Sequence, residues 1–290
     1  MLLQDPLVSV GLPVRNGVLT LESVVKSVLA QDHERLELVI SDNASTDRTE
    51  ELCRDLAATD KRIVYHRQPR NVGILNNFTQ AIRLAKGTFF RWVGDDDWLA
   101  PTYVSRCLKA FADDSRLILV TTQMIYTGPD GVTYTHGYHG TALRSSDPIQ
   151  RLWEFVTLLV NGMVIDPIYA LVRREPVAAI SRRNLICEDQ VFATKLVLTG
   201  PWDHVPQVLA HRHVKKLPLP ALARRLGVPV WQAYCDTGVQ CLEMLRVVHH
   251  ARLTPSQRRR ARAAVAMMYL GRNYRKLTQR GRRLMRSIPH

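Results

Sequence analysis

The chain of 290 residues is long enough for one large domain, or for two domains of roughly 150 residues. Hydrophobic residues make up 46% and charged residues 23%, a balance that excludes wholesale disorder. The net charge of +14 is unevenly distributed: residues 1–214 carry 23 Lys and Arg against 24 Asp and Glu, whereas residues 215–290 carry 17 against 2. We therefore treat a near-neutral body and a basic C-terminal region separately.

Cysteine usage and hydropathy indicate the compartment. The five cysteines form no Cys-x-x-Cys pair and their number is odd, which argues against a secreted disulfide framework and a zinc ribbon. The N-terminus lacks the basic and apolar segments of a signal peptide. The most apolar stretch, 152–172, is interrupted by Glu154, Asn161, Asp166 and Pro167, which argues against a membrane-spanning helix. We expect a cytoplasmic protein, either free or peripheral on the inner face of the plasma membrane.

The first half of the body alternates between strand and helix patterns. We expect strands at 7–12, 36–41, 63–67, 88–93 and 117–122, with helices between them that begin near residues 21, 47, 74 and 101. Strands that alternate with helices of this length predict βαβ units. The expected fold class is therefore α/β, with a mostly parallel sheet covered by helices on both faces.

The second half of the body is less regular. Asp130-Gly131 predicts a hairpin turn between 124–126 and 132–135. Further along, we expect a helix at 147–160, a strand at 168–173, a helix from Glu188 to about 198, and a strand at 205–210. From residue 217 onward the pattern is helical, basic and rich in Arg.

Three consecutive carboxylates follow the fourth expected strand, in the sequence Gly94-Asp95-Asp96-Asp97. Ligands of open α/β sheets bind at the carboxyl ends of strands, where these residues lie. Adjacent carboxylates repel one another, and partial burial makes them costly unless a cation neutralises them. Their hard oxygen ligands suit Mg²⁺ or Mn²⁺, shared with substrate phosphates. The alternative, an exposed acidic turn without a metal, stays open.

Six sequence elements occur in the order found in one enzyme family. They are VSVGLPVRN at 8–16, Ser27 with Gln31, LVISDNASTD at 38–47, Asn71-Val-Gly73, GDDDWLAP at 94–101, and Cys187-Glu-Asp189. Together they cover about residues 7–200, and the sequence resembles the family 2 glycosyltransferases. The resemblance implies a Rossmann-like GT-A catalytic domain at 1–214, with a nucleotide-sugar half at about 1–122 and an acceptor half at about 123–214. Residues 215–290 would form a basic, mainly helical C-terminal region.

The resemblance also implies roles for individual residues. Asp42 would contact the nucleobase, and the remaining nucleotide-sugar contacts would come from Pro13, Val14, Arg15, Asn16, Asn71 and Gly73. Asp95 and Asp96 would serve the ribose, the diphosphate and a Mn²⁺ or Mg²⁺ ion, with Asp96 the preferred ligand and Asp97 and His213 as further candidates. Aligned on Trp98 and Pro101, Gly94 stands where many relatives carry the first Asp of Asp-x-Asp. The choice of ligand within 95–97 therefore stays open.

The expected reaction needs a base. Inverting transfer is an in-line displacement, and a carboxylate must accept the proton of the acceptor hydroxyl. The resemblance assigns this role to Asp189, with Glu188 supporting the acceptor or the loop. Spacing alone favours the simpler interpretation that both residues only cap a helix.

The expected function is metal-dependent, inverting glycosyl transfer. The donor would be a UDP-, dTDP- or GDP-sugar and the acceptor a saccharide or a lipid-linked molecule, in polysaccharide, cell-envelope or glycoconjugate biosynthesis. Two other classes of function stay open. One is a nucleotide-sugar binder of the GT-A fold without catalysis, and the other is a basic α/β protein associated with nucleic acid.

The C-terminal region carries an apolar stripe at alternating steps of four and three residues. The stripe consists of Ala263, Met267, Leu270, Tyr274, Leu277, Leu284 and Ile288, and most arginines fall outside it. The stripe could pack on the catalytic domain, with the arginines solvated. It could instead rest on an anionic membrane surface. Nucleic-acid binding is the least favoured, because no module that reads nucleic acid is recognisable.

Overall fold

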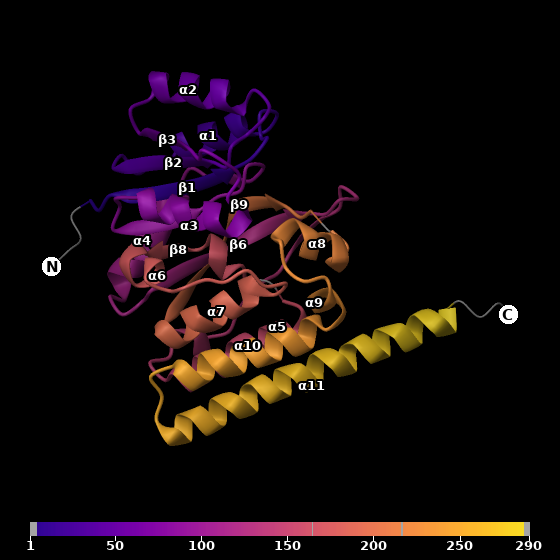
Figure 1. Cartoon of the computed structure of the whole chain (residues 1–290). Coiled ribbons are helices and arrows are strands. Elements are labelled where there is room, and N and C mark those ends of the chain that lie inside the picture. Colours follow the sequence, from indigo (N-terminus) through magenta and orange to yellow (C-terminus); the bar gives the residue numbers. More distant parts are fainter. Residues whose placement is uncertain (1–4, 164, 216, 287–290) are drawn as a thin grey trace.

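Four parallel strands form the first half of the central sheet in the computed structural model, which describes residues 5–163, 165–215 and 217–286. The strands are β1 (Val8–Val14), β2 (Leu36–Asp42), β3 (Ile63–Arg67) and β4 (Phe89–Trp92), in the order β3-β2-β1-β4. The helices α1 (Leu21–Leu29), α2 (Thr49–Thr59) and α3 (Ile74–Leu84) connect them (Figure 1). Every residue of β1 and β2 is buried, as expected for strands covered on both faces.

The second half of the sheet is mixed. Its strands are β5 (Trp98–Leu99), β6 (Leu119–Thr127), β7 (Thr133–Thr135), β8 (Leu171–Arg173) and β9 (Trp202–His213). The sheet continues from β4 through β8, β6 and β9 to β5, and β7 pairs with β6. β8 is antiparallel to both of its neighbours, and β5 is antiparallel to β9. The predicted α/β fold is confirmed, but the parallel pattern is continuous only among β1–β4.

The remaining helices of the body cover this half of the sheet. They are α4 (Tyr103–Asp113), η1 (Ala142–Arg144), α5 (Pro148–Asn161), η2 (Pro167–Tyr169), α6 (Arg174–Ala178) and α7 (Glu188–Thr199). The apolar side chains of α5 and α7 share one buried cluster with Trp92 and Trp202 of the sheet. The helices are therefore fixed by burial of apolar surface, and α7 presents its first turn, with Asp189, at one end of this core.

Two expected strands have different limits in the structure. The strand expected at 168–173 is confined to β8, because Asp166 adopts a left-handed conformation (φ 44°) and Pro167 then begins the 3₁₀ turn η2. The strand expected at 205–210 is part of the longer β9, whose register against β6 shifts between Val205 and Val208, where Pro206 lies, and again between Val208 and Ala210. Proline cannot donate a backbone hydrogen bond, so a bulge at this point is expected. Because β9 extends to His213, beyond the expected end at 210, His211 and His213 belong to the strand.

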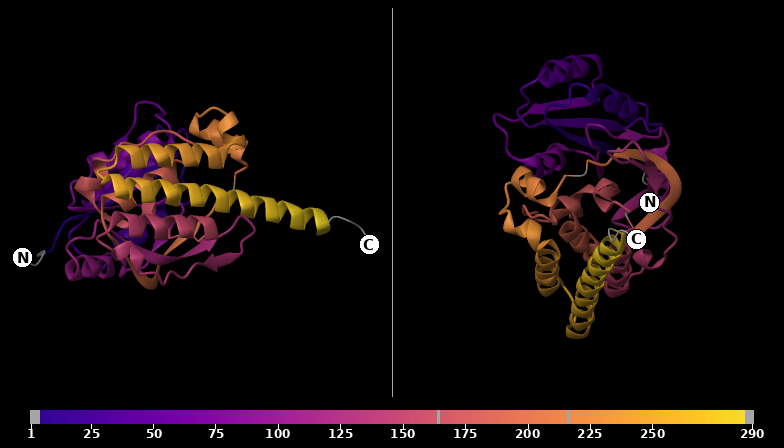
Figure 2. Two further views of the ribbon diagram at one scale, coloured as in Figure 1. Left: turned by 90° about the horizontal axis from the view of Figure 1, so that it is seen from below. Right: turned by 90° about the vertical axis from the view of Figure 1, so that its right-hand side faces the viewer.

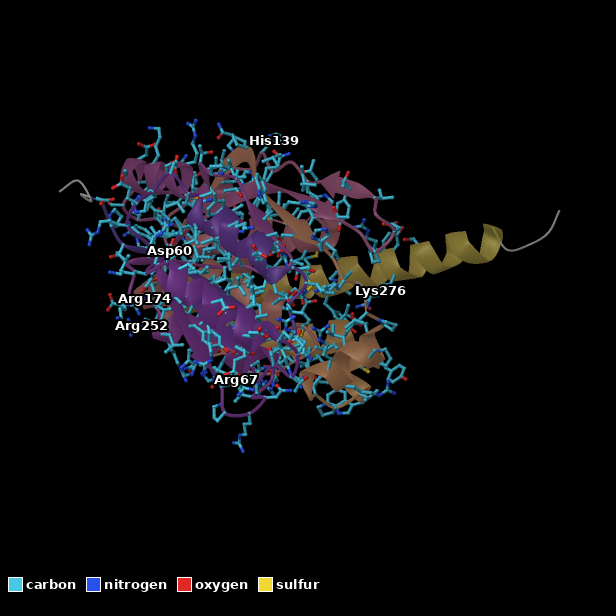
Figure 3. The ribbon with its side chains drawn as sticks, turned by 90° about the horizontal axis from the view of Figure 1, so that it is seen from above. Asp60, Arg67, His139, Arg174, Arg252 and Lys276 are labelled. Atoms are coloured by element: carbon cyan, nitrogen blue, oxygen red, sulfur yellow. The ribbon has the colours of Figure 1, made fainter. Side chains whose placement is uncertain are left out.

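The C-terminal region forms α8 (Leu219–Leu226), α9 (Trp231–Tyr234), α10 (Asp236–His250) and α11 (Pro255–Arg286). α10 and α11 lie side by side beneath α5 and α7, at the opposite pole from β1–β3 (Figures 1 and 2). The end of α11 projects beyond the body. Lys276, labelled in Figure 3, lies near the start of this projection, and its Nζ donates to Oδ1 of Asp236 at 2.7 Å. No helix among the described residues is both long and apolar enough to cross a bilayer.

The packed face of α11 is not the expected stripe. Met267, Leu270 and Tyr274 are exposed by 55%, 61% and 71%, and Ala263 is also exposed. The buried residues are instead Ala261, Ala264, Val265 and Met268, which join the core formed with α5 and α10. Leu277 and Leu284 have side chains outside the described part of the chain, and Ile288 lies outside it entirely. The stripe predicted from the sequence is therefore the outer face of the helix, at least as far as Tyr274.

Candidate active site

The carboxyl ends of β1 and β4 meet the end of β9 at a cavity of about 470 Å³. Six residues predicted to form the site line this cavity, namely Pro13, Val14, Arg15, Asp95, Asp96 and His213. Residues that were not predicted line it too, including Tyr126, Asp166, Tyr169, Arg212, Lys215 and Arg225. The cavity therefore combines carboxylates with several cations, as a site for a charged ligand requires.

Asp42 ends β2 and is fully buried. Its Oδ1 accepts hydrogen bonds from the backbone N–H of Ser45 at 2.9 Å and from the Ser45 hydroxyl at 2.5 Å, and its Oδ2 accepts one from the Tyr65 hydroxyl at 2.9 Å. The Ser45 hydroxyl in turn accepts from the backbone N–H of Asn16 at 2.9 Å. These bonds tie the loop after β2 to the loop after β1 and give both a fixed shape beside the cavity.

Asn71 and Gly73 shape the loop before α3. Oδ1 of Asn71 accepts from the N–H of Gly73 at 3.0 Å, and Gly73 has a φ of 86°, which glycine adopts without strain. The neighbouring Val72 donates its N–H to Oδ1 of Asn43 at 2.8 Å. This loop is thus attached to the end of β2 and brings Ile74 to the cavity wall.

The three consecutive aspartates have different surroundings. Asp95 and Asp96 line the cavity, where Nζ of Lys215 lies 3.8 Å from Oδ1 of Asp95 and 2.8 Å from Oδ2 of Asp96. Desolvation raises the pKa of Asp95, Lys215 lowers it, and repulsion from Asp96 and Asp97 adds to the increase. Asp97, with a side chain only 1% exposed, turns inward, and its Oδ2 accepts from the N–H of Gly94 at 2.9 Å. The structure therefore separates Asp97 from the other two carboxylates.

His213 lies beside the acidic loop, which consists of residues 94–97. Its Nδ1 is 2.7 Å from the backbone carbonyl of Asp96. Because a carbonyl only accepts, this contact requires the proton on Nδ1 and leaves Nε2 with its lone pair in the neutral ring. On the other side of the loop, Nε2 of Gln31 donates to the carbonyl of Ala100 at 2.8 Å. Contacts from β9 and from Gln31, which follows α1, thus hold the segment from Asp96 to Ala100.

Arg212 connects three parts of the site. Its Nε donates to Oδ2 of Asp97 at 3.2 Å, its Nη1 donates to Oδ2 of Asp166, and its guanidinium lies 3.5 Å from the centre of the Tyr169 ring. Desolvation lowers the pKa of Arg212, but Tyr169 and the two carboxylates outweigh this effect and raise it overall. Arg212 therefore remains charged. Sequence reasoning missed this role, although the pattern Arg212-His213 was a loose signal for it.

Asp189 lies in the first turn of α7 and is accessible to solvent. Protein atoms nevertheless crowd its carboxylate, and this desolvation raises the pKa of Asp189 to about 6, with repulsion from Glu188 and Asp166 adding to the shift. Asp189 does not itself line the cavity, but its carboxylate is close enough to Asp166, which does, for the two to repel each other. A carboxyl group with this pKa is suited to proton transfer near neutral pH.

Glu188 is positioned differently from its neighbour. It accepts two hydrogen bonds from Arg182, at 2.7 and 2.6 Å, and lines a second cavity of about 820 Å³ near α10. The Arg182 guanidinium also lies 4.2 Å from the centre of the ring of Phe192, which belongs to α7 like Glu188. Glu188 thus anchors the first turn of α7 and does not line the cavity that contains Asp95 and Asp96.

The acidic residues of the site supply only part of a metal centre among the described residues. Within the part of the chain that the structure describes, no group of three or more His, Cys, Asp or Glu side chains is arranged as a complete metal centre. Asp95 and Asp96 nevertheless present hard oxygen atoms to the cavity, and a lysine ammonium already lies against both. Mg²⁺ commonly binds through one or two carboxylates together with substrate phosphates. The donor set therefore fits a cation that arrives with a diphosphate.

Comparison with known proteins identifies the family. The model of glycosyl transferase family 2 matches residues 9–180, more than half of the chain. A chondroitin synthase of Pasteurella multocida is 34% identical over 134 residues, which represent 46% of this chain and 14% of that protein. The matched segment thus spans about one seventh of the length of this relative.

Two solved structures show the same fold. TarS of S. aureus in complex with UDP-GlcNAc has a TM-score of 0.67 at 17% identity, covering 91% of this chain and 72% of that one. A mannosyltransferase of Pyrobaculum calidifontis in complex with GDP-Man and Mn²⁺ has a TM-score of 0.62 at 18% identity, covering 94% of this chain and 72% of that one. The chain belongs to glycosyltransferase family 2 and has a GT-A fold.

Proposed function

We propose that the protein transfers a sugar, with inversion, from a nucleoside-diphosphate sugar to an acceptor hydroxyl, and that it uses Mn²⁺ or Mg²⁺. The observation that carries this proposal is the cavity at the carboxyl ends of β1 and β4, where Asp95 and Asp96 face Arg212, Lys215 and Arg225. A diphosphate with a cation matches this mixture of charges. The complexes of the structural neighbours with UDP-GlcNAc and with GDP-Man and Mn²⁺ support the same ligand class.

The donor would extend from the loop after β1 to the acidic loop after β4. We assign the nucleobase to the end formed by Arg15 and the loop that Asp42 organises, and Pro13, Val14 and Asn16 shape the neighbouring wall. We assign the diphosphate to the region of Asp95 and Asp96. A cation held there, with Asp96 as the preferred ligand and Asp95 as the second, would stabilise the negative charge that develops on the departing diphosphate.

The acceptor hydroxyl would lose its proton to the carboxylate of Asp189. Its oxygen then attacks the anomeric carbon, while the bond from that carbon to the diphosphate oxygen breaks and the electron pair leaves with the diphosphate. Attack opposite the leaving group inverts the anomeric configuration. The raised pKa of Asp189, about 6, makes its carboxylate a stronger base than an ordinary Asp while it stays mostly ionised at neutral pH. The bidentate contact between Arg182 and Glu188 would keep this turn of α7 in place.

A thermal-shift panel tests the donor class directly. UDP-, dTDP- and GDP-sugars are added with Mn²⁺, with Mg²⁺ or with EDTA. We expect at least one donor to raise the Tm, and we expect EDTA to remove most of the gain. Failure of every donor to raise the Tm contradicts the proposal. Stabilisation by a donor without turnover on any saccharide or lipid-linked acceptor favours the alternative of a nucleotide-sugar binder without catalysis.

We further propose that the enzyme works in polysaccharide, cell-envelope or glycoconjugate biosynthesis, in the cytoplasm and at the inner face of the plasma membrane. The support is the exposed stripe of Met267, Leu270 and Tyr274 on α11, with Arg259 and Arg262 exposed near its beginning. An apolar stripe beside arginines complements the acyl chains and anionic head groups of a bilayer surface. Because the opposite face of α11 packs on the body, the stripe can bind a membrane without unfolding the helix.

A further inference from the structure

The end of β9 contacts the acidic loop three times in succession. Arg212 donates to Asp97, His213 contacts the carbonyl of Asp96, and the ammonium of Lys215 pairs with Asp96 and Asp95. The N–H of Val214 also donates to the carbonyl of Thr127 at 2.8 Å, so the backbone follows β6 for one residue beyond β9. The contacts of Arg212, His213 and Val214 therefore fix the backbone before Lys215 and hold this lysine beside the two carboxylates.

The ammonium of Lys215 contacts the carboxylates that the proposed cation requires. Its Nζ lies 2.8 Å from Oδ2 of Asp96 and 3.8 Å from Oδ1 of Asp95. Among the described residues, Lys215 alone forms an ion pair with either carboxylate within 4 Å. A divalent ion and an ammonium group cannot both bind this pair at short range without strong repulsion. Binding of the metal therefore requires Lys215 to move away.

We propose that Lys215 is the counter-ion of Asp95 and Asp96 before the donor binds, and that it transfers to the diphosphate when metal and donor enter together. This inference rests on the proposed function. The Lys215 side chain is 59% exposed, and its flexible stem allows the ammonium to swing between partners. Arg225 lines the same cavity and adds positive charge to it.

When Lys215 moves from the two carboxylates to the diphosphate, the binding of the metal and the binding of the nucleotide become coupled. Metal alone must displace Lys215 and leaves its ammonium without a partner, so it binds weakly. Metal with a nucleoside diphosphate supplies a new anion for the ammonium, so it binds more tightly. Coupling of this kind is reciprocal, and the nucleotide also binds more tightly when the metal is present. Lys215 would thus act as a positioning residue that favours joint loading of cation and donor.

Titration of Mn²⁺, followed by the electron paramagnetic resonance signal of the free ion, tests this inference on the whole chain. Wild type, Lys215→Met, Lys215→Arg and the control Lys61→Met, an exposed lysine after α2, are titrated without nucleotide and with UDP or GDP. We expect Lys215→Met to bind Mn²⁺ alone at least fivefold more tightly than wild type. The factor by which the nucleotide tightens Mn²⁺ binding should fall at least fivefold in this variant.

The remaining variants are controls, and two outcomes would contradict the inference. Lys215→Arg retains the charge and should stay within about twofold of wild type, as should Lys61→Met. If Lys215→Met binds Mn²⁺ alone no more tightly than wild type, while UDP or GDP still enhances Mn²⁺ binding in wild type, the inference is wrong and the metal-dependent function stands. If no variant binds Mn²⁺ with either nucleotide, both are wrong.

Discussion

Nε of Arg212 donates a hydrogen bond to Oδ2 of Asp97 across 3.2 Å, although the two residues are 115 positions apart in the chain. The same guanidinium pairs with Asp166 and stacks on Tyr169. One cation thus neutralises two carboxylates and joins the acidic loop, the turn before η2 and the end of β9. The position of the acidic loop therefore depends on a residue that does not belong to the loop.

Replacement of Arg212 by Met should destabilise the fold. Asp97 and Asp166 would lose their shared cation, and a carboxylate as buried as that of Asp97 cannot easily be solvated instead. We expect the free energy of unfolding to fall by about 3 kcal/mol, as measured by urea denaturation. Arg212→Lys should recover part of the loss, because it retains the charge but not the two-sided geometry of the guanidinium.

The matched control is Arg116→Met. Arg116 pairs with Asp114 at 2.7 Å, but its side chain is 59% exposed, so its loss should cost less than about 1 kcal/mol. A loss for Arg212→Met no larger than that for Arg116→Met would contradict the role of Arg212 as the link between these segments.

Asp189→Asn should reduce kcat by about 10³-fold while donor binding stays unchanged, because the amide cannot accept the hydroxyl proton. A general base acts in its deprotonated form. With the pKa of Asp189 raised to about 6, the rate of the chemical step in wild type should increase as the pH rises through 6 and level off above it. Single-turnover rates between pH 5 and 8 measure this profile.

The Tm of Asp189→Asn shows whether a loss of activity comes from lost catalysis or from unfolding. A carboxyl group whose pKa is raised by folding stabilises the folded state at low pH, and this contribution is lost as the pH rises through about 6. Removal of the charge should therefore not lower the Tm at pH 7.5. The surface variant Asp113→Asn serves as the control and should retain full activity. Activity of Asp189→Asn close to that of wild type would exclude it as the base.

Asp96→Asn and Asp97→Asn should have opposite effects. Asp96 lines the cavity, so its replacement should abolish the part of the nucleotide-induced Tm increase that depends on Mn²⁺ and should change the Tm of the free protein little. Asp97 is held by Gly94 and Arg212, so its replacement should lower the Tm and leave the Mn²⁺-dependent increase in place. Thermal melts with UDP or GDP, each with Mn²⁺ and with EDTA, test both. The reverse pattern would make Asp97 the ligand.

Local sequence patterns predicted the parts of the site that lie at the ends of parallel strands. Pro13 is one of the last two residues of β1, and Arg15 and Asp95 follow buried strands whose carboxyl ends meet at one edge of the sheet. That convergence could be read from the alternation of strands and helices. Arg212 and Lys215 could not be found in this way. They reach the acidic loop because β5 pairs antiparallel with β9, with Trp98 opposite His211. This pairing joins segments more than 100 residues apart, and no periodicity within either segment encodes it.

The packed face of α11 could not be determined from the sequence for a different reason. Apolar residues recur at steps of three and four along two different faces of α11. The face with the larger side chains gives the more conspicuous apolar stripe in the sequence. The structure packs the face with small residues, because α11 lies close to α5: a Cβ on Gly271 would lie only 2.9 Å from Cγ1 of Val160. Small side chains allow such an approach, and close packing then determines which face is buried.

Adjacent methionines on α11 test this assignment. Met268 is fully buried in the cluster shared with α5 and α10, whereas Met267 is 55% exposed. Met268→Ala should reduce the free energy of unfolding by about 3 kcal/mol, since it removes buried methylene groups and leaves a cavity. Met267→Ala should change it by less than about 0.5 kcal/mol. Urea denaturation of both variants measures the difference, and equal losses would contradict the observed orientation of the helix.

The exposed stripe makes a separate prediction about membranes. Leu270→Glu places a negative charge in the middle of the stripe, where the side chain is 61% exposed, so the Tm should stay within about 2 °C of wild type. Flotation with vesicles that contain anionic lipid should fall severalfold, because the new carboxylate is costly to bury among acyl chains and is repelled by the head groups. Val132→Glu, at an exposed valine in the turn between β6 and β7, provides the matched control and should float like wild type. If Leu270→Glu floats as well as Val132→Glu does, α11 does not attach the enzyme to the bilayer.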